Sequence, residues 1–424
     1  MRNIIAETNE LLREISMHPD LTDIQEMTKA FVSEMEKGLR GEKSSIPMIP
    51  TYISALGTPP ENVPVIAVDA GGTNLRVALV TFVNGKPTVT RLEKYPMPGS
   101  LFEISSDEFF TELAEKILPL TEVSDRIGFC FSYPAEIFPN RDGKIMCLTK
   151  EVSVTDSEGK IIGQEVKKKL AEMGVKKDLS FTLLNDTVAS LMGGVAEYTL
   201  SGFDGICGLI LGTGYNTCCL EKGENISKLD KASDMIINCE SGNFTKAVRG
   251  KVDEIIDITA EHPDVNTLER LLSGAYIGKI VTNTAHFAAQ KGLLSERFSE
   301  VLPPFTSPEL DDFLRGAENR VSLMCAGEDA EVLREIIDKT FERAARLVCA
   351  NIAALCLHYN GGKSAEKPFG VVAEGSTFYK SLLFREKLDK YVKSDIEGKL
   401  SRFVVFKQAD NATLTGSALS ALLS

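Results

Sequence analysis

The sequence predicts an α/β protein of two related halves with a cleft between them. The first observation behind this prediction is a repeated pattern: a strand, a loop of glycine and threonine, and a second strand occur at residues 65–83 and again at 205–221. The second is that strand patterns and helical patterns follow one another over much of the chain. The third is the length of 424 residues, which suits two or three domains.

The composition is that of an ordinary globular protein, with 43% hydrophobic and 25% charged residues. The net charge of −13 argues against binding of nucleic acid or of an anionic membrane through bulk charge. Tryptophan is absent, so aromatic stacking platforms are not expected. An anionic ligand would instead be held by local groups, such as backbone amides at glycine turns.

The sequence shows no sign of secretion or of a membrane anchor. The N-terminus contains glutamates and lacks the long apolar core of a signal peptide. The longest nearly apolar run, residues 347–357, is shorter than the roughly 20 residues that span a bilayer. The nine cysteines form no CxxC pair and the four histidines are scattered, which indicates reduced thiols and no zinc site. We therefore expect a cytoplasmic protein.

The chain begins with a helix and a connector. Apolar residues at helical spacing predict a helix over residues 24–39, which Gly38 and Gly41 end. Residues 44–64 are rich in proline and also contain apolar side chains that need burial, so we expect an ordered connector.

The repeated pattern begins after this connector. In the first half the sequence predicts strands at 65–69, 75–83, 88–95, 126–131 and 181–184, and helices at 106–118, 163–173 and 187–198. In the second half it predicts strands at 205–211, 216–220, 369–373 and 403–406, a mostly helical stretch over 245–359, and a C-terminal helix from Thr413.

Two glycine loops suggest phosphate binding. In the first, Asp69-Ala-Gly-Gly-Thr-Asn74, adjacent glycines let backbone N–H groups face a ligand, and Asp69 could hold a cation or its water. The second, residues 212–214, is followed by a strand, so it is not a dinucleotide fingerprint, and the chain has no P-loop motif. A plain hairpin turn is the alternative for each loop alone.

Asn185 and Asp186 follow a predicted strand and precede a helix. Ligand sites in α/β sheets concentrate at this edge, where a carboxylate can accept a proton from a substrate hydroxyl. The alternative is that these residues only cap the helix. Ser132, Lys150, Glu240 and Glu269 are polar residues that would each be ordinary surface positions if they were considered alone.

Together and in order, these segments resemble the hexokinase family of sugar kinases, within the actin-like ATPase superfamily. The resemblance covers nearly the whole chain, although Ser241 stands where the family usually has tryptophan. One such motif is common by chance, whereas eight in the same order are not. They are Val68-Asp-Ala-Gly-Gly-Thr-Asn-Leu-Arg76, Phe131-Ser-Tyr-Pro134, Leu148-Thr-Lys150, Leu184-Asn-Asp-Thr-Val188, Leu211-Gly-Thr-Gly-Tyr-Asn216, Cys239-Glu-Ser-Gly242, Glu269 with Ser273-Gly-Ala-Tyr-Ile-Gly278, and Ala373-Glu-Gly-Ser376.

The resemblance implies two actin-like (ribonuclease H-like) domains, each with a mixed sheet flanked by helices, separated by a cleft. The small domain would contain residues 62–186 and be rejoined by 411–424, and the large domain would contain 1–61 and 187–410. It further implies that the domains close on the sugar, which excludes water as a competing phosphoryl acceptor.

The implied activity is ATP-dependent phosphorylation of the 6-hydroxyl of glucose, with mannose and fructose as further candidate substrates. Asp186 would be the general base, and Lys150 would place positive charge near the phosphoryl group. The residues implied to bind the sugar are Ser132, Thr149, Lys150, Asn185, Asp186, Asn216, Glu240 and Glu269. Those implied to bind ATP are Gly71, Gly72, Thr73, Asn74, Arg76, Gly212, Thr213, Gly375 and Ser376, and Asp69 would hold Mg²⁺ through water.

Two other classes of protein are alternatives. A non-catalytic sugar sensor on the same fold would close on the sugar without forming ADP. An actin-like or chaperone-like ATPase would hydrolyse ATP without a sugar, and would leave the glutamate segments unexplained. The expected partners are a hexose and ATP, without nucleic acid or membrane, in a monomer or homodimer.

Overall fold

The computed structural model describes residues 3–55, 57–148, 152–198, 200–299 and 303–423. The chain forms two compact units. One, called the helical unit, contains Met1–Pro47, Leu209–Thr217 and Cys239–Val405; the other, called the sheet unit, contains Met48–Gly208, Cys218–Asn238 and Phe406–Ser424. The predicted domain boundaries at residues 62–186 and 411–424 stay a prediction.

Strands dominate the first half of the chain, as the sequence predicts. The strands and α-helices described between residues 49 and 238, of which β1 lies within the connector, are β1 (Ile49–Pro50), β2 (Val65–Ala70), β3 (Asn74–Val83), β4 (Lys86–Pro96), β5 (Ile104–Ser105), α3 (Ser106–Thr121), β6 (Arg126–Phe131), β7 (Ala135–Ile137), β8 (Gly143–Ile145), β9 (Val154–Thr155), α4 (Ile162–Glu172), β10 (Ser180–Leu184), α5 (Asp186–Glu197), β11 (Ile206–Leu211), β12 (Tyr215–Glu221) and β13 (Met235–Asn238).

Helices dominate both ends of the chain. They and the remaining strands are α1 (Ile4–Glu14), α2 (Ile24–Arg40), α6 (Lys251–Ile258), α7 (Glu269–Leu272), α8 (Gly274–Gln290), α9 (Ser307–Leu314), α10 (Arg320–Met324), α11 (Asp329–His358), β14 (Phe369–Glu374), α12 (Ser376–Lys380), α13 (Phe384–Tyr391), α14 (Gly398–Leu400), β15 (Val404–Lys407) and α15 (Ala412–Leu422). In the helical unit the long helix α11 contacts α1, α2, α7, α8 and α13.

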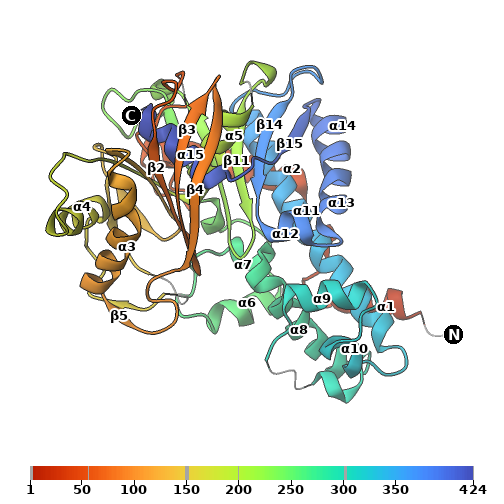
Figure 1. Cartoon of the computed structure of the whole chain (residues 1–424). Helices are drawn as coiled ribbons and strands as arrows, with labels where there is room; N and C mark the ends of the chain where they lie inside the picture. Colours follow the sequence, from red (N-terminus) through yellow and green to blue (C-terminus); the bar gives the residue numbers. More distant parts are fainter. Residues whose placement is uncertain (1–2, 56, 149–151, 199, 300–302, 424) are drawn as a thin grey trace. The chain divides into compact units, whose positions relative to one another are not determined.

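The sheet unit is built on a five-stranded sheet in the order β10-β6-β2-β3-β4. β10, β6 and β2 are parallel, and β3 and β4 are antiparallel, so the sheet is mixed, as the sequence predicts. Because side chains alternate along a strand, Ile66, Val68 and Ala70 of β2 point to the face that α3 and α4 cover. Figure 1 shows α3 and α4 on one side of this sheet and α15 on the other.

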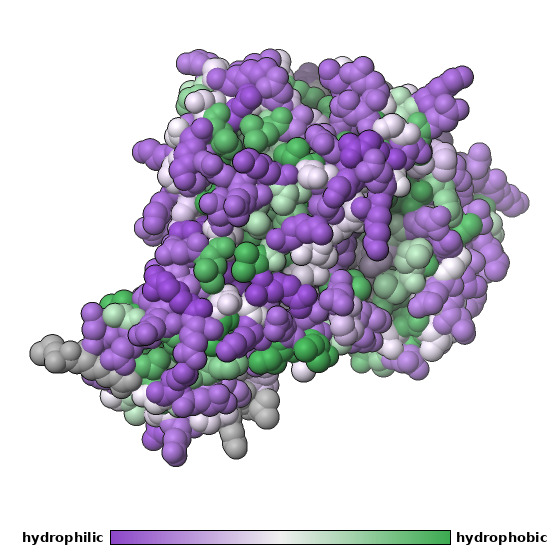
Figure 2. Space-filling view, turned by 180° about the vertical axis from the view of Figure 1, so that it is seen from behind, coloured by the Kyte–Doolittle hydropathy of each residue, from purple (hydrophilic) through white to green (hydrophobic). Residues whose placement is uncertain are grey.

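A second sheet has six strands in the order β1-β13-β12-β11-β14-β15. The sequence does not predict β1 and β13, because strands of two and four residues are too short to show a period. On the face shown in Figure 2, hydrophilic residues predominate and hydrophobic ones form small groups. Within the described ranges, no helix combines the length and the apolar character needed to cross a bilayer.

Helix α15 lies close to the sheet because glycines face it. A Cβ atom on Gly128 of β6 would lie 2.1 Å from the carbonyl oxygen of Ser417. A Cβ on Gly416 would lie 1.9 Å from the carbonyl oxygen of Ala189 in α5, and one on Gly193 would lie 2.4 Å from that of Ala412. Since each side chain would overlap backbone atoms, these glycines fix the position of α15 against β6 and α5.

We expect Gly416→Ala to lower the free energy of unfolding by about 1–3 kcal/mol or more, because the added methyl group overlaps backbone that cannot move alone. Urea or thermal unfolding measures the loss. Gly202→Ala is the matched control, since nothing lies within 4 Å of the place that its methyl group would take, and it should stay within about 0.5 kcal/mol of the original chain. Equal stability of the two variants would contradict the close packing of α15.

Glu34 of α2 contacts the beginning of the connector predicted at residues 44–64. The Glu34 carboxylate accepts hydrogen bonds from the Ser45 amide at 2.7 Å, the Ser44 hydroxyl at 3.1 Å and the Lys37 ammonium at 2.8 Å. Burial acts to raise the pKa of Glu34, but the bonds from Lys37, Ser45 and Ser44 outweigh it and lower the pKa to about 2.

This lowered pKa predicts a specific acid sensitivity. The Glu34 carboxylate contributes stability above its unfolded pKa of about 4.3, and this contribution is lost as the pH falls toward 2. We expect Glu34→Gln to be less stable than the original chain at pH 7 and to lose less stability between pH 4.5 and 2.5, measured by urea unfolding. Glu36→Gln, at an exposed neighbour, should leave the acid profile unchanged, and identical profiles for both variants would refute the role of Glu34.

Candidate active site

Three parallel strands bring the sequence-predicted catalytic segments to one edge of the sheet unit. In the β10–β6 pair Leu184 lies opposite Cys130, and in the β6–β2 pair Cys130 lies opposite Asp69. Leu184, Cys130 and Asp69 thus form one row across the three strands. Two residues further along each strand's chain come Asp186, Ser132 and the first glycine of the loop, Gly71. Because these strands run in the same direction, their carboxyl ends place all three segments side by side.

Asn185 and Asp186 lie at the start of helix α5, and both side chains bond to its first turn. A role in capping alone is the alternative to a ligand site at these residues. The Asn185 side chain accepts a hydrogen bond from the Thr187 amide at 2.9 Å, and Oδ1 of Asp186 accepts one from the same amide at 2.7 Å. Both side chains are half-buried. Asn185 is the N-cap of α5, and the bond from the Thr187 amide orients the Asp186 carboxylate at the edge of the sheet.

The carboxylates of Asp69 and Asp186 both raise the pKa of the Cys130 thiol. Burial, followed by the negative charges of Asp69 and Asp186, raises the pKa of the Cys130 thiol well above its usual value. Since charges must be near to have this effect, Asp69 and Asp186 both lie in the neighbourhood of Cys130.

The first glycine loop is held by a residue that the sequence did not single out. The Tyr133 hydroxyl lies 2.9 Å from the carbonyl oxygen of Gly71 and 2.8 Å from that of Gly72. The Gly71 amide donates to the Asn74 carbonyl at 3.0 Å and closes the hairpin. Tyr133 lies within one of the recognised motifs, but only the fold shows that its hydroxyl reaches the loop.

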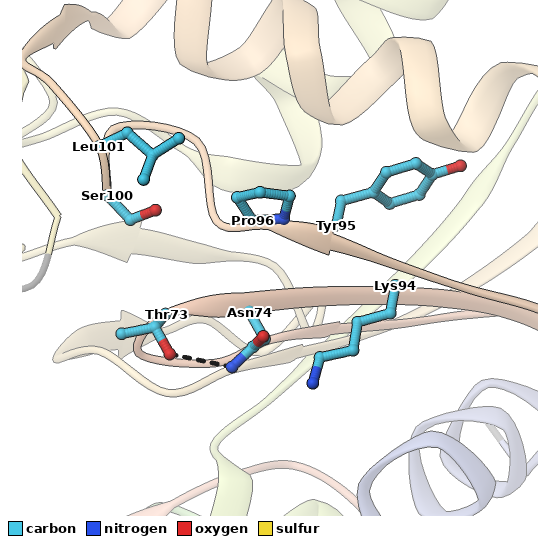
Figure 3. A pocket seen from close by; sticks show the side chains of 7 residues that line it. All are labelled: Thr73, Asn74, Lys94, Tyr95, Pro96, Ser100 and Leu101. Atoms are coloured by element: carbon cyan, nitrogen blue, oxygen red, sulfur yellow. Dashed lines mark hydrogen bonds between the residues drawn. The ribbon is translucent and has the colours of Figure 1, made fainter.

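Thr73 and Asn74, at the end of the loop, line a surface pocket (Figure 3). Both side chains are exposed, and the Asn74 amide donates to the Thr73 hydroxyl at 2.9 Å. The pocket is lined by Thr73, Asn74, Lys94, Tyr95, Pro96, Ser100 and Leu101. Lys94 adds a positive charge beside the loop, which is favourable for a phosphate-binding loop and was not predicted.

Asp69 and Arg76 form an ion pair at the base of the same hairpin. They are opposite each other in the β2–β3 pair, and Nε and Nη2 of Arg76 donate to Oδ2 of Asp69 at 2.9 and 2.5 Å. The Asp69 side chain is 11% exposed and the Arg76 side chain 31%. A carboxylate held in this way, next to glycine amides, suits a position that orients water around Mg²⁺.

The second glycine loop is assembled in the helical unit. The Gly212 amide donates to the Gly214 carbonyl at 3.0 Å, and the Gly212 carbonyl accepts from the Gly274 amide at 2.8 Å and from the Thr377 hydroxyl at 3.0 Å. These bonds join the loop to the start of α8 and to the segment that contains Gly375 and Ser376. A Cβ on Gly375, whose φ is +116°, would lie 2.2 Å from the Leu211 carbonyl oxygen, so only glycine is accommodated.

Glu269 contacts this second loop directly. Its Oε2 atom accepts a hydrogen bond from the Tyr215 amide at 2.9 Å, and a Cβ on Gly214 would lie 2.7 Å from the same oxygen. Glu269, the predicted sugar-binding carboxylate, therefore packs against the predicted phosphate loop. It occupies space that is open because Gly214 has no side chain.

Asn216 and Glu240 are brought to the same region of the helical unit. Oδ1 of Asn216 accepts from the amides of Thr217 at 2.7 Å and Ser241 at 3.2 Å. Glu240 has a left-handed backbone with φ of 54°, which is uncommon outside glycine and often marks functional positions. Ser241 is buried and its hydroxyl bonds to that of Thr217 at 3.0 Å, so it fills a polar niche where the family usually has tryptophan.

The structure thus groups the predicted residues within each unit. Asp69, the first loop, Ser132, Asn185 and Asp186 belong to the sheet unit, and the second loop, Asn216, Glu240, Glu269, Gly375 and Ser376 belong to the helical unit. The predicted Thr149 and Lys150 lie outside the described residues.

Comparison with known proteins agrees with these features. Two hexokinase family models match residues 8–196 and 206–423. Hexokinase-1 of Schizosaccharomyces pombe is 28% identical over 94% of this chain and 87% of its own length, and Hexokinase-2 of Candida albicans is 27% identical over 95% and 89%. Among solved structures, the Schistosoma mansoni hexokinase complexed with glucose has a TM-score of 0.81 at 23% identity, covering 99% of this chain and 98% of that one.

The fold and the two glycine loops define an α/β sugar kinase with mixed sheets in two domains. This chain belongs to the hexokinase family, since that family's models cover nearly all of it. Its activity is that of a hexokinase, the ATP-dependent phosphorylation of a sugar. The fold class, family and enzyme class that the sequence predicts are confirmed.

Gly214→Ala should raise KM for the hexose about tenfold or more, because the new methyl group would take the place of the Glu269 carboxylate, and a charged hydrogen bond is worth about that factor. Initial rates over a range of hexose concentrations measure this change. Gly202→Ala, which meets nothing within 4 Å, is again the control. A KM that stays at the original value would show that the contact between Gly214 and Glu269 does not matter for the sugar.

Proposed function

We propose that this hexokinase transfers the γ-phosphoryl group of ATP to the 6-hydroxyl of glucose, with Asp186 as the general base. The observation that carries the proposal is the register of β10, β6 and β2, which puts Asp186, Ser132 and the first glycine loop at one sheet edge. Glucose is favoured because the structurally similar hexokinase from Schistosoma mansoni was solved with it.

In this proposal Asp186 removes the proton of the 6-hydroxyl as the oxygen attacks phosphorus. A general base of this kind contributes about 10²–10⁴-fold to the rate. The bond from the Thr187 amide to Oδ1 of Asp186 holds the carboxylate in place, so that little reorganisation is needed at the moment of reaction. Lys150 would supply positive charge to the phosphoryl group.

The sugar would be recognised by hydrogen bonds, because a hexose offers many hydroxyl groups and little apolar area. In the sheet unit Ser132, Asn185 and Asp186 would provide them, and Thr149 and Lys150 would join them. In the helical unit Asn216, Glu240 and Glu269 would provide carboxylate and amide partners. Such sites reject analogues strongly, since a missing hydroxyl leaves buried polar groups unpaired.

ATP would be held mainly by backbone amides, which suits a chain with a net charge of −13. Gly71, Gly72, Thr73, Asn74, Arg76, Gly212 and Thr213 would hold the phosphates, and Gly375 and Ser376 would lie by the adenosine. Mg²⁺, when bound, neutralises negative charge on the phosphates. Asp69 would orient its water.

The predicted two domains, 62–186 with 411–424 and 1–61 with 187–410, belong to this proposal, with closure on the sugar that keeps water from acting as acceptor. A cytoplasmic location and a monomeric or homodimeric state are likewise proposed from the sequence alone.

Asp186→Asn should lower kcat at least 100-fold, because the amide keeps the helix cap but cannot accept the hydroxyl proton. A coupled assay for ADP formation measures kcat, and calorimetry measures glucose binding, which should be largely retained. Asp312→Asn, at an exposed carboxylate on α9, is the control and should leave kcat unchanged. Near-normal turnover by the Asp186→Asn variant would remove the general-base assignment.

The same assay separates the other classes of function. Initial rates with glucose, mannose and fructose at fixed MgATP should show ADP formation that depends on the sugar. Calorimetric binding of a hexose with no ADP formation would indicate a sugar sensor. ADP formation that is independent of any hexose would indicate an ATPase of the actin or chaperone type.

A further inference from the structure

We propose that Thr413, near the start of the C-terminal helix α15, is a positioning residue that fixes the Asp69 carboxylate through its side-chain hydroxyl. This inference rests on the proposed role of Asp69 at the phosphates of ATP. In the sequence Thr413 marks only the beginning of a predicted helix, and it lies 344 positions from Asp69 along the chain.

The hydroxyl of Thr413 makes two bonds of defined direction. Nη2 of Arg76 donates to Oγ1 of Thr413 at 2.8 Å, and Oγ1 donates to Oδ2 of Asp69 at 3.1 Å. A guanidinium can only donate and a carboxylate can only accept, so the single hydroxyl proton must point at Asp69. The three groups therefore form a closed triangle, because Arg76 also donates to Asp69.

The triangle uses one oxygen of the carboxylate. Arg76 Nε, Arg76 Nη2 and Thr413 Oγ1 all donate to Oδ2 of Asp69. None of these bonds uses Oδ1, so the rotation of the carboxylate is fixed and Oδ1 is directed away from the triangle. This is the property that a carboxylate needs if it is to orient a hydrated cation.

An Arg–Asp pair alone would not hold this orientation. The Arg76 side chain is 31% exposed, and ion pairs that are open to solvent gain little and stay mobile. Thr413 supplies a third point from α15, which packs closely against β6 and α5. Gly128 of β6 and Gly416 of α15 allow backbone approaches that any side chain would block. The position of the C-terminal helix is thereby transmitted to the first glycine loop.

The test compares Thr413→Val, which keeps the shape and removes the hydroxyl, with Thr413→Ser, which keeps the hydroxyl. Thr415→Val is the control on the same helix: Thr415 is buried, whereas Thr413 is half-buried, and within the described residues its hydroxyl donates to the carbonyls of Asn411 and Ala412 and not to Asp69. Calorimetry of the full chain measures the affinity for the non-hydrolysable analogue AMP-PNP, once with Mg²⁺ and once with EDTA. Steady-state rates give KM for MgATP and for glucose.

We expect Thr413→Val to weaken binding of Mg²⁺ with AMP-PNP about three- to tenfold, the range of one hydrogen bond, and to raise KM for MgATP equally. Binding of AMP-PNP in EDTA and KM for glucose should stay unchanged, and Thr413→Ser should restore the affinity. A purely structural role would instead change both nucleotide titrations, and Thr415→Val would then show the same loss as Thr413→Val.

Asp69→Asn separates this inference from the function on which it rests. If Asp69→Asn weakens the magnesium-dependent binding while Thr413→Val does not, the positioning role of Thr413 is wrong and the role of Asp69 stands. If neither variant changes that binding, both are wrong. If Thr413→Val and Thr415→Val lose affinity alike, or Ser fails to restore it, the hydroxyl bond is not the cause and the inference is overturned.

Discussion

The parallel pairing of β10, β6 and β2 is the constraint on which the candidate active site depends. These strands are far apart in the sequence, and only their shared direction brings the ends at Leu184, Phe131 and Ala70 to the same edge. A slip of one residue in either pair would turn alternate side chains to the other face and bury or expose the wrong groups. Helix α15 packs closely against Gly128 of β6, the middle one of these three strands.

Each unit supplies a loop of similar chemistry in a different way. In the sheet unit, Tyr133 braces the carbonyls of Gly71 and Gly72. In the helical unit, backbone bonds from α8 and the Thr377 hydroxyl brace Gly212, and Glu269 rests against the loop. If both loops bind phosphate as proposed, a strongly acidic protein can hold a triphosphate in this manner, since oriented amides near the ligand would supply the attraction in place of the net charge.

Much of this arrangement could be predicted from the sequence, because it is encoded locally. The strand around Val68, the glycines after Asp69 and the pair Asn185-Asp186 are recognised by residue type and spacing. The contributions of Tyr133, Lys94 and Thr413 could not be predicted, because each depends on a contact that the chain makes only after folding. The strands β1 and β13 could not be predicted for another reason: they are too short to show a hydrophobic period. The roles of the site residues themselves stay predictions.

The glycines in and around the second loop, residues 212–214, tolerate few substitutions. Gly214 faces the Glu269 carboxylate, and Gly274 and Gly375 approach the main chain of Gly212 and Leu211, so a side chain added at any of these three glycines would displace its neighbours. Ser241, which stands where the family usually has tryptophan, is buried and bonds to the Thr217 hydroxyl, so a larger side chain at this position would require its neighbours to move.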